Sequence, residues 1–170
     1  MHCLINQNNS VYIEKNIIDN DTTKKLIKDI LFEVKTNPGH GNNPPLQTYP
    51  NLLEIYKKSH WKKYKKVVKE FVVKNLKKDV EFQKTWANVT VPGQKYYKHR
   101  HPDIDFSTVL YLQNAYPFFG TRIEDNLIVP GEEKSIMGMS GNMEHKVEDM
   151  PYELAMKNIR ITIVSNFNYV

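Results

Sequence analysis

The sequence predicts a mainly β fold of the α+β type, in which a small β-sandwich or barrel is supported by N-terminal helices. Apolar residues recur at helical spacing up to about residue 80, and short β-branched and aromatic segments separated by turn signals follow. The length of 170 residues fits a single domain, 1–170, with a helical part at about 1–80 and a β core at about 81–170. Hydrophobic residues make up 40% of the chain, which is enough for a core and argues against intrinsic disorder.

The first predicted helix begins in the segment 21–23, because its aspartate and threonines are good N-terminal caps. Leucine and isoleucine then recur at helical spacing over residues 26–31, and Asn37-Pro38-Gly39 ends the helix. The stretch 39–50 is rich in proline, glycine and asparagine, so we expect a loop there.

The second predicted helix runs from about residue 52 to residue 76 and has two different faces. Its apolar stripe includes Tyr64 and Phe71, whereas ten lysines between residues 57 and 78 occupy much of the remaining surface. Lysines in this number could attract nucleic acid, but a solvated helix face is the commoner explanation. Arginine is absent from this stretch, which does not favour the reading of bases.

Short strands separated by turns fill the rest of the chain. The turn signals include Pro92-Gly93, Pro130-Gly131 and Ser140-Gly141. The predicted strands are Thr85–Val91, Lys95–Lys98, Phe106–Leu112, Asn126–Val129, Ser135–Met139, Lys146–Glu148 and Ile159–Phe167.

The composition argues against several classes of protein. No run of 18 apolar residues occurs, and the first ten residues lack the pattern of a secretory signal, so neither a membrane protein nor an exported one is expected. The single cysteine, Cys3, can form no internal disulfide and no thiolate zinc cage. We therefore expect a cytoplasmic location.

The net charge of +5 conceals an asymmetry along the chain. Residues 1–100 hold 19 basic and 9 acidic residues, a balance of +10, and residues 101–170 hold 5 and 10, a balance of −5. Lysine outnumbers arginine 21 to 3, so each arginine is worth examining. Arg160 lies among isoleucines in a predicted strand, which indicates a specific demand for a guanidinium group there.

Three histidines in the strand-rich half form a candidate metal site. His99 and His101 are two residues apart and would point to the same side of an extended segment. His145 follows a turn, and a neighbouring strand could bring it to the other two. Imidazole suits zinc, iron, copper or nickel, and three ligands leave positions open for substrates. Asp103 offers a carboxylate as an alternative ligand.

Four segments in order resemble the Fe(II)/2-oxoglutarate-dependent dioxygenases, most closely the prolyl-hydroxylase-like branch and a set of small oxygenases of bacteria and phages. The segments are Gly93-Gln94-Lys95-Tyr96-Tyr97-Lys98-His99-Arg100-His101, Thr108-Val109-Leu110-Tyr111-Leu112-Gln113, His145-Lys146-Val147 and Arg160-Ile161-Thr162. The resemblance covers about residues 85–168. It implies a double-stranded β-helix, or jelly roll, in which the helices ahead of it are the supporting helices, and it fits a phage or bacterial source.

The resemblance also implies the chemistry. It implies that a second, unidentified substrate is hydroxylated with O₂, while 2-oxoglutarate is decarboxylated to succinate. The implied iron ligands are His99, His101 and His145. The residues implied to bind 2-oxoglutarate are Arg160, Thr162 and Tyr111, with Asn88 as a lesser candidate.

Two questions stay open at this point. The family's usual aspartate falls on His101, whereas a register shifted to His101-Pro102-Asp103 would restore a carboxylate but spoil the match at Gln94 and Tyr96, so His101 is preferred. The other question is the class of protein. A cupin-like metal-binding protein or isomerase that does not use 2-oxoglutarate, and a lysine-rich nucleic-acid-binding module, are the alternatives.

Overall fold

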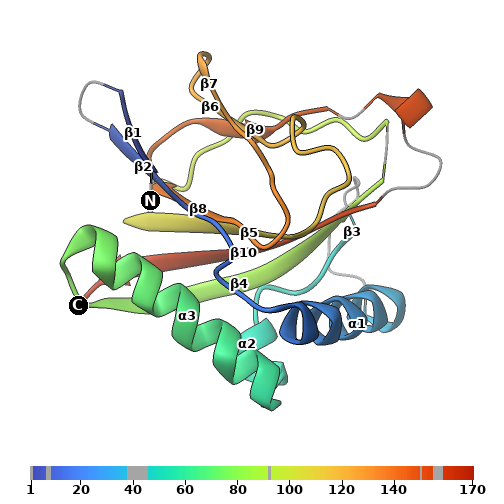
Figure 1. Cartoon of the computed structure of the whole chain (residues 1–170). Helices are drawn as coiled ribbons and strands as arrows, with labels where there is room; N and C mark the ends of the chain where they lie inside the picture. Colours follow the sequence, from blue (N-terminus) through green and yellow to red (C-terminus); the bar gives the residue numbers. More distant parts are fainter. Residues whose placement is uncertain (1, 7–8, 38–45, 92, 150, 155–158) are drawn as a thin grey trace.

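The computed structural model describes residues 2–6, 9–37, 46–91, 93–149, 151–154 and 159–170 (Figure 1). The helices are α1 (Asn20–Thr36), α2 (Leu52–Ile55), α3 (Ser59–Leu76) and the 3₁₀ turn η1 (Tyr152–Leu154). The strands are β1 (His2–Asn6), β2 (Asn9–Glu14), β3 (Leu46–Gln47), β4 (Val80–Thr90), β5 (Phe106–Gln113), β6 (Thr121–Ile123), β7 (Leu127–Val129), β8 (Ile136–Ser140), β9 (His145–Val147) and β10 (Arg160–Tyr169).

The strands form two antiparallel sheets, as expected for a jelly roll. The large sheet has the order β1-β2-β8-β5-β10-β4-β3, and the small sheet has the order β7-β6-β9. The helices lie against one face of the large sheet and the small sheet lies over the other face (Figure 1). The prediction of a mainly β fold with supporting helices is therefore confirmed.

Each face of the large sheet has its own core. On the helix side, buried residues of α1 and α3 such as Leu26, Trp61 and Val68 pack against Ile161 and Ile163 of β10. On the side of the small sheet, a second cluster includes Val109, Tyr111, Ile123, Met137 and Val164. Because side chains alternate along a strand, the residues of β10 serve the two cores in turn. The second core is the one that surrounds the candidate site.

The interior strand β10 pairs with β5 on one side and β4 on the other and so sets the register between them. Thr162 lies opposite Asn88 of β4 and opposite Tyr111 of β5, so these three side chains form a row on the inner face. Arg160 lies opposite Thr90 and is two residues from Thr162, which places it on the same face. The register of three strands thus brings together residues that are far apart in the sequence.

Several local predictions differ from the structure. The helix expected over about 52–76 is two helices, because Tyr56 is extended and Lys58 caps a new helix at Ser59. The first helix is capped by the Asp19 side chain, which accepts from the Thr22 amide at 2.9 Å, rather than by a residue of 21–23.

The part before residue 80 is also not wholly helical. It contributes the short strand β3 and the pair β1 and β2, which extends the large sheet beyond β8. Of the loop expected over 39–50, residues 39–45 lie outside the described part of the chain. None of the helices in the described ranges is long and apolar enough to cross a bilayer.

Candidate metal centre

The three histidines singled out by the sequence come together between the two sheets. One ligand atom of each of His99, His101 and His145 lies within 4.8 Å of the others. The ring centroids of His99 and His145 are 4.3 Å apart, and that of His101 is 5.1 Å from His99 and 5.2 Å from His145. Three imidazoles at these separations can bind one ion on one side and leave its other side open.

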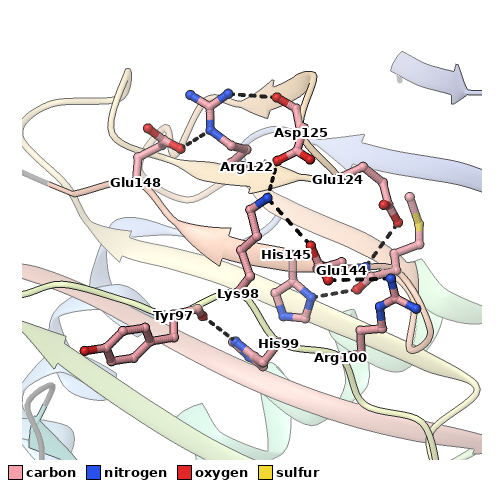
Figure 2. A network of polar contacts seen from close by, with 11 residues as sticks. Tyr97, Lys98, His99, Arg100, Arg122, Glu124, Asp125, Glu144, His145 and Glu148 are labelled. Carbon is pink, nitrogen blue, oxygen red and sulfur yellow. Dashed lines mark hydrogen bonds and ion pairs between the residues drawn. The ribbon is translucent and has the colours of Figure 1, made fainter.

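Backbone carbonyls orient two of the rings. The Nδ1–H of His145 donates to the Met143 carbonyl at 2.9 Å, and that of His99 donates to the Tyr97 carbonyl at 3.1 Å (Figure 2). Because Nδ1 carries the proton, the lone pair of each ring is on Nε2. The backbone therefore fixes the tautomer that a metal ion requires.

Burial keeps two of the three imidazoles, those of His101 and His145, uncharged before a metal binds. Desolvation lowers the pKa of His101 to about 4, and the neighbouring His99 and Lys84 act in the same direction. Desolvation also lowers the pKa of His145 to about 4, since only 6% of this residue is exposed. At neutral pH both imidazoles are neutral and are available as ligands.

Backbone hydrogen bonds hold the ligand-bearing segments together. His99 and His145 exchange two such bonds, each of 3.0 Å, in a single antiparallel bridge. The amide of His101 donates to the Gly141 carbonyl at 2.8 Å. A side chain at Gly141 would clash with the Ile104 carbonyl oxygen and lie 2.8 Å from that of His101, so this position requires glycine. From the sequence, Ser140-Gly141 was predicted only to form a turn, with no link to the histidines.

The strand predicted over Lys95–Lys98 is absent, because the segment has few ladder partners. The Tyr96 amide donates to the Asp149 side chain at 3.4 Å, and a ladder-type pair forms only at His99. The segment is held instead by side chains on its outer surface.

A charged network holds these segments at the outer surface (Figure 2). Glu144, which precedes His145, lies 3.7 Å from Lys98 and 3.5 Å from Arg100. Lys98 also pairs with Asp125 in the turn between β6 and β7. We call this network the charged clamp; its members are Lys98, Arg100, Arg122, Glu124, Asp125, Glu144 and Glu148.

Arg160 is buried with part of its guanidinium unpaired. Only 1% of the residue is exposed. Its Nη1 donates to the carbonyls of Phe119 at 2.6 Å and Glu148 at 3.4 Å, but Nη2 has no partner among the described residues. An unpaired buried cationic donor is costly unless a ligand satisfies it, and a carboxylate is its best complement.

Other residues expected to accompany Arg160 lie on the same face of the large sheet. Tyr111 is buried, its hydroxyl lies 2.5 Å from that of Thr121, and burial raises its pKa, so the phenol stays neutral. Asn88 has a buried side-chain oxygen with no partner within the described ranges. Together with Thr162, these groups form a polar row in an otherwise apolar core.

Tyr96 belongs with this group, although the sequence reasoning gave it no role. The centre of its ring lies 5.6 Å from the guanidinium carbon of Arg160, and its hydroxyl bonds that of Thr90, which is opposite Arg160 in the sheet. Burial raises the pKa of Tyr96, so it too is neutral at physiological pH. Its place in the Tyr96-Tyr97-Lys98-His99 segment was the signal that could have identified it.

Asp103, the alternative ligand, lies outside the three-imidazole group. It is exposed and lines the rim of a pocket of about 520 Å³ beside His101. Trp86 and Lys84 of β4 and Arg100 also line this pocket, and the Trp86 ring centre is 6.1 Å from that of His101. The pocket gives a molecule in solution a route to the imidazole cluster.

The two sheets form a jelly roll that is also found in solved structures of 2-oxoglutarate-dependent oxygenases. The viral collagen prolyl hydroxylase of Paramecium bursaria Chlorella virus-1, in complex with 2-oxoglutarate, superposes with a TM-score of 0.66 at 12% identity, over 94% of this chain and 96% of that one.

Two bacterial proteins superpose similarly. HygX of Streptomyces hygroscopicus with nickel and 2-oxoglutarate bound gives a TM-score of 0.70 at 8% identity, over 93% of this chain and 82% of that one. A prolyl-4-hydroxylase of Pseudomonas putida gives 0.65 at 14% identity, over 93% and 91%. No protein-family model and no curated protein matches the sequence. The structural similarities establish the jelly-roll fold of this chain.

Proposed function

We propose that the protein is an enzyme, an Fe(II)- and 2-oxoglutarate-dependent dioxygenase that hydroxylates a substrate still to be identified. The observation that carries this proposal is the buried guanidinium of Arg160 with its unpaired Nη2. Arg160 contacts the Glu148 carbonyl, three residues beyond His145, and lies over Tyr96, three residues before His99. An anion-binding group is therefore built next to the segments that carry the imidazole cluster.

The imidazole cluster fits a divalent transition metal. His99, His101 and His145 would hold the ion through nitrogen lone pairs, two of them fixed as Nε2 by carbonyl contacts. We assign His101 rather than Asp103 as the third ligand, because Asp103 is not part of the group. Three neutral ligands leave both positive charges of the ion uncompensated, which favours an anionic co-substrate.

The polar row fits the distal carboxylate of 2-oxoglutarate. Arg160 would bind it, with Thr162 and the neutral Tyr111 hydroxyl as further hydrogen-bonding groups and Asn88 beside them. The surrounding apolar residues Val109, Met137 and Val164 exclude water and strengthen this charge interaction. When bound, Fe(II), 2-oxoglutarate and O₂ supply C–H hydroxylation with release of succinate and CO₂.

Anaerobic titration tests the proposal. Fe(II)-loaded protein titrated with 2-oxoglutarate should develop a weak visible absorption band from the metal-bound oxo acid, and His145→Ala should abolish the band. A parallel assay of succinate in air measures turnover without a prime substrate.

The variant Arg160→Ala separates the proposed enzyme from a cupin-like protein or isomerase. If the proposal holds, this variant keeps metal binding, measured with Co(II) by its visible spectrum, but loses succinate formation. Metal binding by the native protein with no 2-oxoglutarate band and no succinate would contradict the dioxygenase and leave the cupin-like alternative.

We also propose that residues 1–170 act as one domain in the cytoplasm. The large sheet joins strands from both ends of the chain, from β1 to β10, in support of one unit. The lone Cys3 suits a reducing compartment. A phage source remains a prediction from the sequence resemblance.

A further inference from the structure

We propose that α3 is a docking surface for single-stranded nucleic acid, which passes around the edge of β4 ahead of Thr85 into the pocket beside His101. Docking does not depend on a metal ion, whereas modification of a base at the pocket rests on the proposed function. The inference starts from where the lysines of α3 lie.

Four lysines form a stripe on one flank of α3. Lys62, Lys65, Lys66 and Lys69 follow steps of three, one and three residues, so they share one side of the helix. We call them the lysine stripe. They line a shallow groove of about 620 Å³ together with Val73, Lys74 and a single acid, Glu70.

The stripe is short of acidic partners, unlike the other flank. On that flank Lys63 pairs with Asp19 at 2.6 Å, and at the end of the groove Lys74 pairs with Glu14 at 3.1 Å, so these two lysines are partly neutralised. Within the described ranges, the only ion pair of the stripe joins Lys66 to Glu70 at a long 3.9 Å, one helical turn away. Three of its four cations are thus available to external anions.

The stripe continues toward the pocket along β4. The Lys65 ammonium lies 5.7 Å from the centre of the Phe82 ring, and Lys84 follows Phe82 by two residues, about 7 Å along the strand. Lys84 itself lines the pocket beside His101 together with Arg100. On this edge of β4, β3 pairs with residues 88 and 89, and the Thr85 amide donates to the Pro50 carbonyl at 3.2 Å. Within the described ranges, no strand pairs with this edge ahead of Thr85, which is where Phe82 and Lys84 lie.

The pocket suits a nucleotide better than an acidic side chain. Its volume of about 520 Å³ is within the range of small-molecule sites. The half-buried ring of Trp86 lines it and offers a face on which a base can stack, while Lys84 and Arg100 lie near enough to meet phosphates. A single strand can bend around the sheet edge, which a stiff duplex cannot do without cost.

Fluorescence anisotropy of metal-free protein with a labelled oligothymidylate of about 12 nucleotides, a typical single-strand site size, tests docking. With five phosphate contacts, the logarithm of the binding constant should fall with the logarithm of the salt concentration with a slope of about −3.5. Replacing the four stripe lysines by glutamine leaves the contacts of Lys84 and Arg100, so it should reduce the slope to about −1.4 and weaken binding more than tenfold at low salt. Lys84→Gln should reduce the slope by about 0.7.

A matched variant controls for net charge. Lys24, Lys25, Lys28 and Lys35 are exposed on α1, so replacing all four by glutamine removes the same charge from another surface. This variant should bind the oligonucleotide within twofold of the native protein, and circular dichroism checks that both variants fold.

Three results would overturn the proposal. The first is that the native protein does not bind the oligonucleotide at low salt, and the second is that the α1 and α3 variants weaken binding equally. The third is that polyglutamate of equal charge displaces the oligonucleotide, which would indicate an acidic protein partner. A stripe variant that loses the oligonucleotide but keeps the anaerobic 2-oxoglutarate band would support docking while leaving the proposed function intact. Loss of the band alone would count against the proposed function only.

Discussion

At the scale of single residues, the chain uses arginine sparingly and buries one. Two arginines, Arg100 and Arg122, belong to the charged clamp, and Arg160 lies among apolar side chains with an unpaired Nη2. A lysine would keep the charge but could not present two parallel N–H groups to a carboxylate. The use of arginine at position 160 therefore predicts a ligand whose carboxylate accepts two parallel hydrogen bonds.

We expect Arg160→Lys to weaken 2-oxoglutarate binding by about 10- to 100-fold, since one charge-assisted hydrogen bond is lost. The anaerobic absorption titration measures this dissociation constant. Metal affinity, followed with Co(II), should not change, because Arg160 is not a ligand. An unchanged affinity for 2-oxoglutarate in this variant would place the carboxylate elsewhere.

The histidines predict how the stability of the metal-free protein depends on pH. His101 and His145 have pKa values of about 4 when folded and near 6.5 when unfolded. Between these values the unfolded chain binds more protons, so the free energy of unfolding falls as the pH falls from 6.5 to 4. For His145 alone the loss should be on the order of 1–3 kcal/mol.

Urea unfolding at several pH values checks this expectation. His145→Gln should reduce the slope of the free energy of unfolding against pH between pH 6.5 and pH 4, since glutamine does not titrate, and the contribution of His101 should remain. The same slope in native protein and variant would show that His145 is not held neutral by burial.

At the scale of elements, the charged clamp compensates for the missing strand before His99. We expect Glu144→Gln to lower metal affinity by about tenfold, because residues that orient ligands typically contribute that much. Isothermal titration with Ni(II) measures the change. Glu54→Gln, at an exposed position on α2, is the matched control and should leave the affinity unaltered.

The sequence predicted those elements whose residues carry a local signal. Continuous β-branched and aromatic runs identified β4, β5 and β10, and the two-residue spacing of His99 and His101 indicated a shared side. The break before α3 was missed, because the apolar stripe continues through it. Tyr56 leaves the helix where its hydroxyl reaches Glu33 of α1 at 2.8 Å, a contact between distant segments.

Pairing between distant segments also explains the other features of the structure that the sequence did not predict. The strand β2 forms because Tyr12 and Ile13 find partners at Gly138 and Met137, more than a hundred residues away. The role of Tyr96 depends on Arg160, and the requirement for glycine at position 141 depends on the path of the His101 segment. No local pattern contains such information, whereas the resemblance to a family conveyed the outline of the site.

At the scale of the whole molecule, a bound ion would tie separate parts of the chain together. His145 belongs to the small sheet, while His99 and His101 lie in the connection between β4 and β5 of the large sheet. At about 100 times its dissociation constant, an ion should stabilise the fold by about 2.7 kcal/mol.

This stabilisation corresponds to a rise of about 5–10 °C in the melting temperature, given about 2–4 °C per kcal/mol for a protein of this size. Differential scanning calorimetry with and without Ni(II) measures it, and His145→Ala should abolish it. A rise that survives in this variant would mean that the ion binds somewhere else.

The position of β10 in the large sheet bears on how the protein is made. This strand lies between β4 and β5, yet it is the last of the described strands to leave the ribosome. Until then β4 and β5 lack their shared neighbour and present unsatisfied backbone groups, which invite pairing with other nascent chains. The synthesis of β10 therefore adds Arg160 and Thr162 at the same time as it joins β4 to β5, so the polar row is incomplete in any chain that lacks this strand.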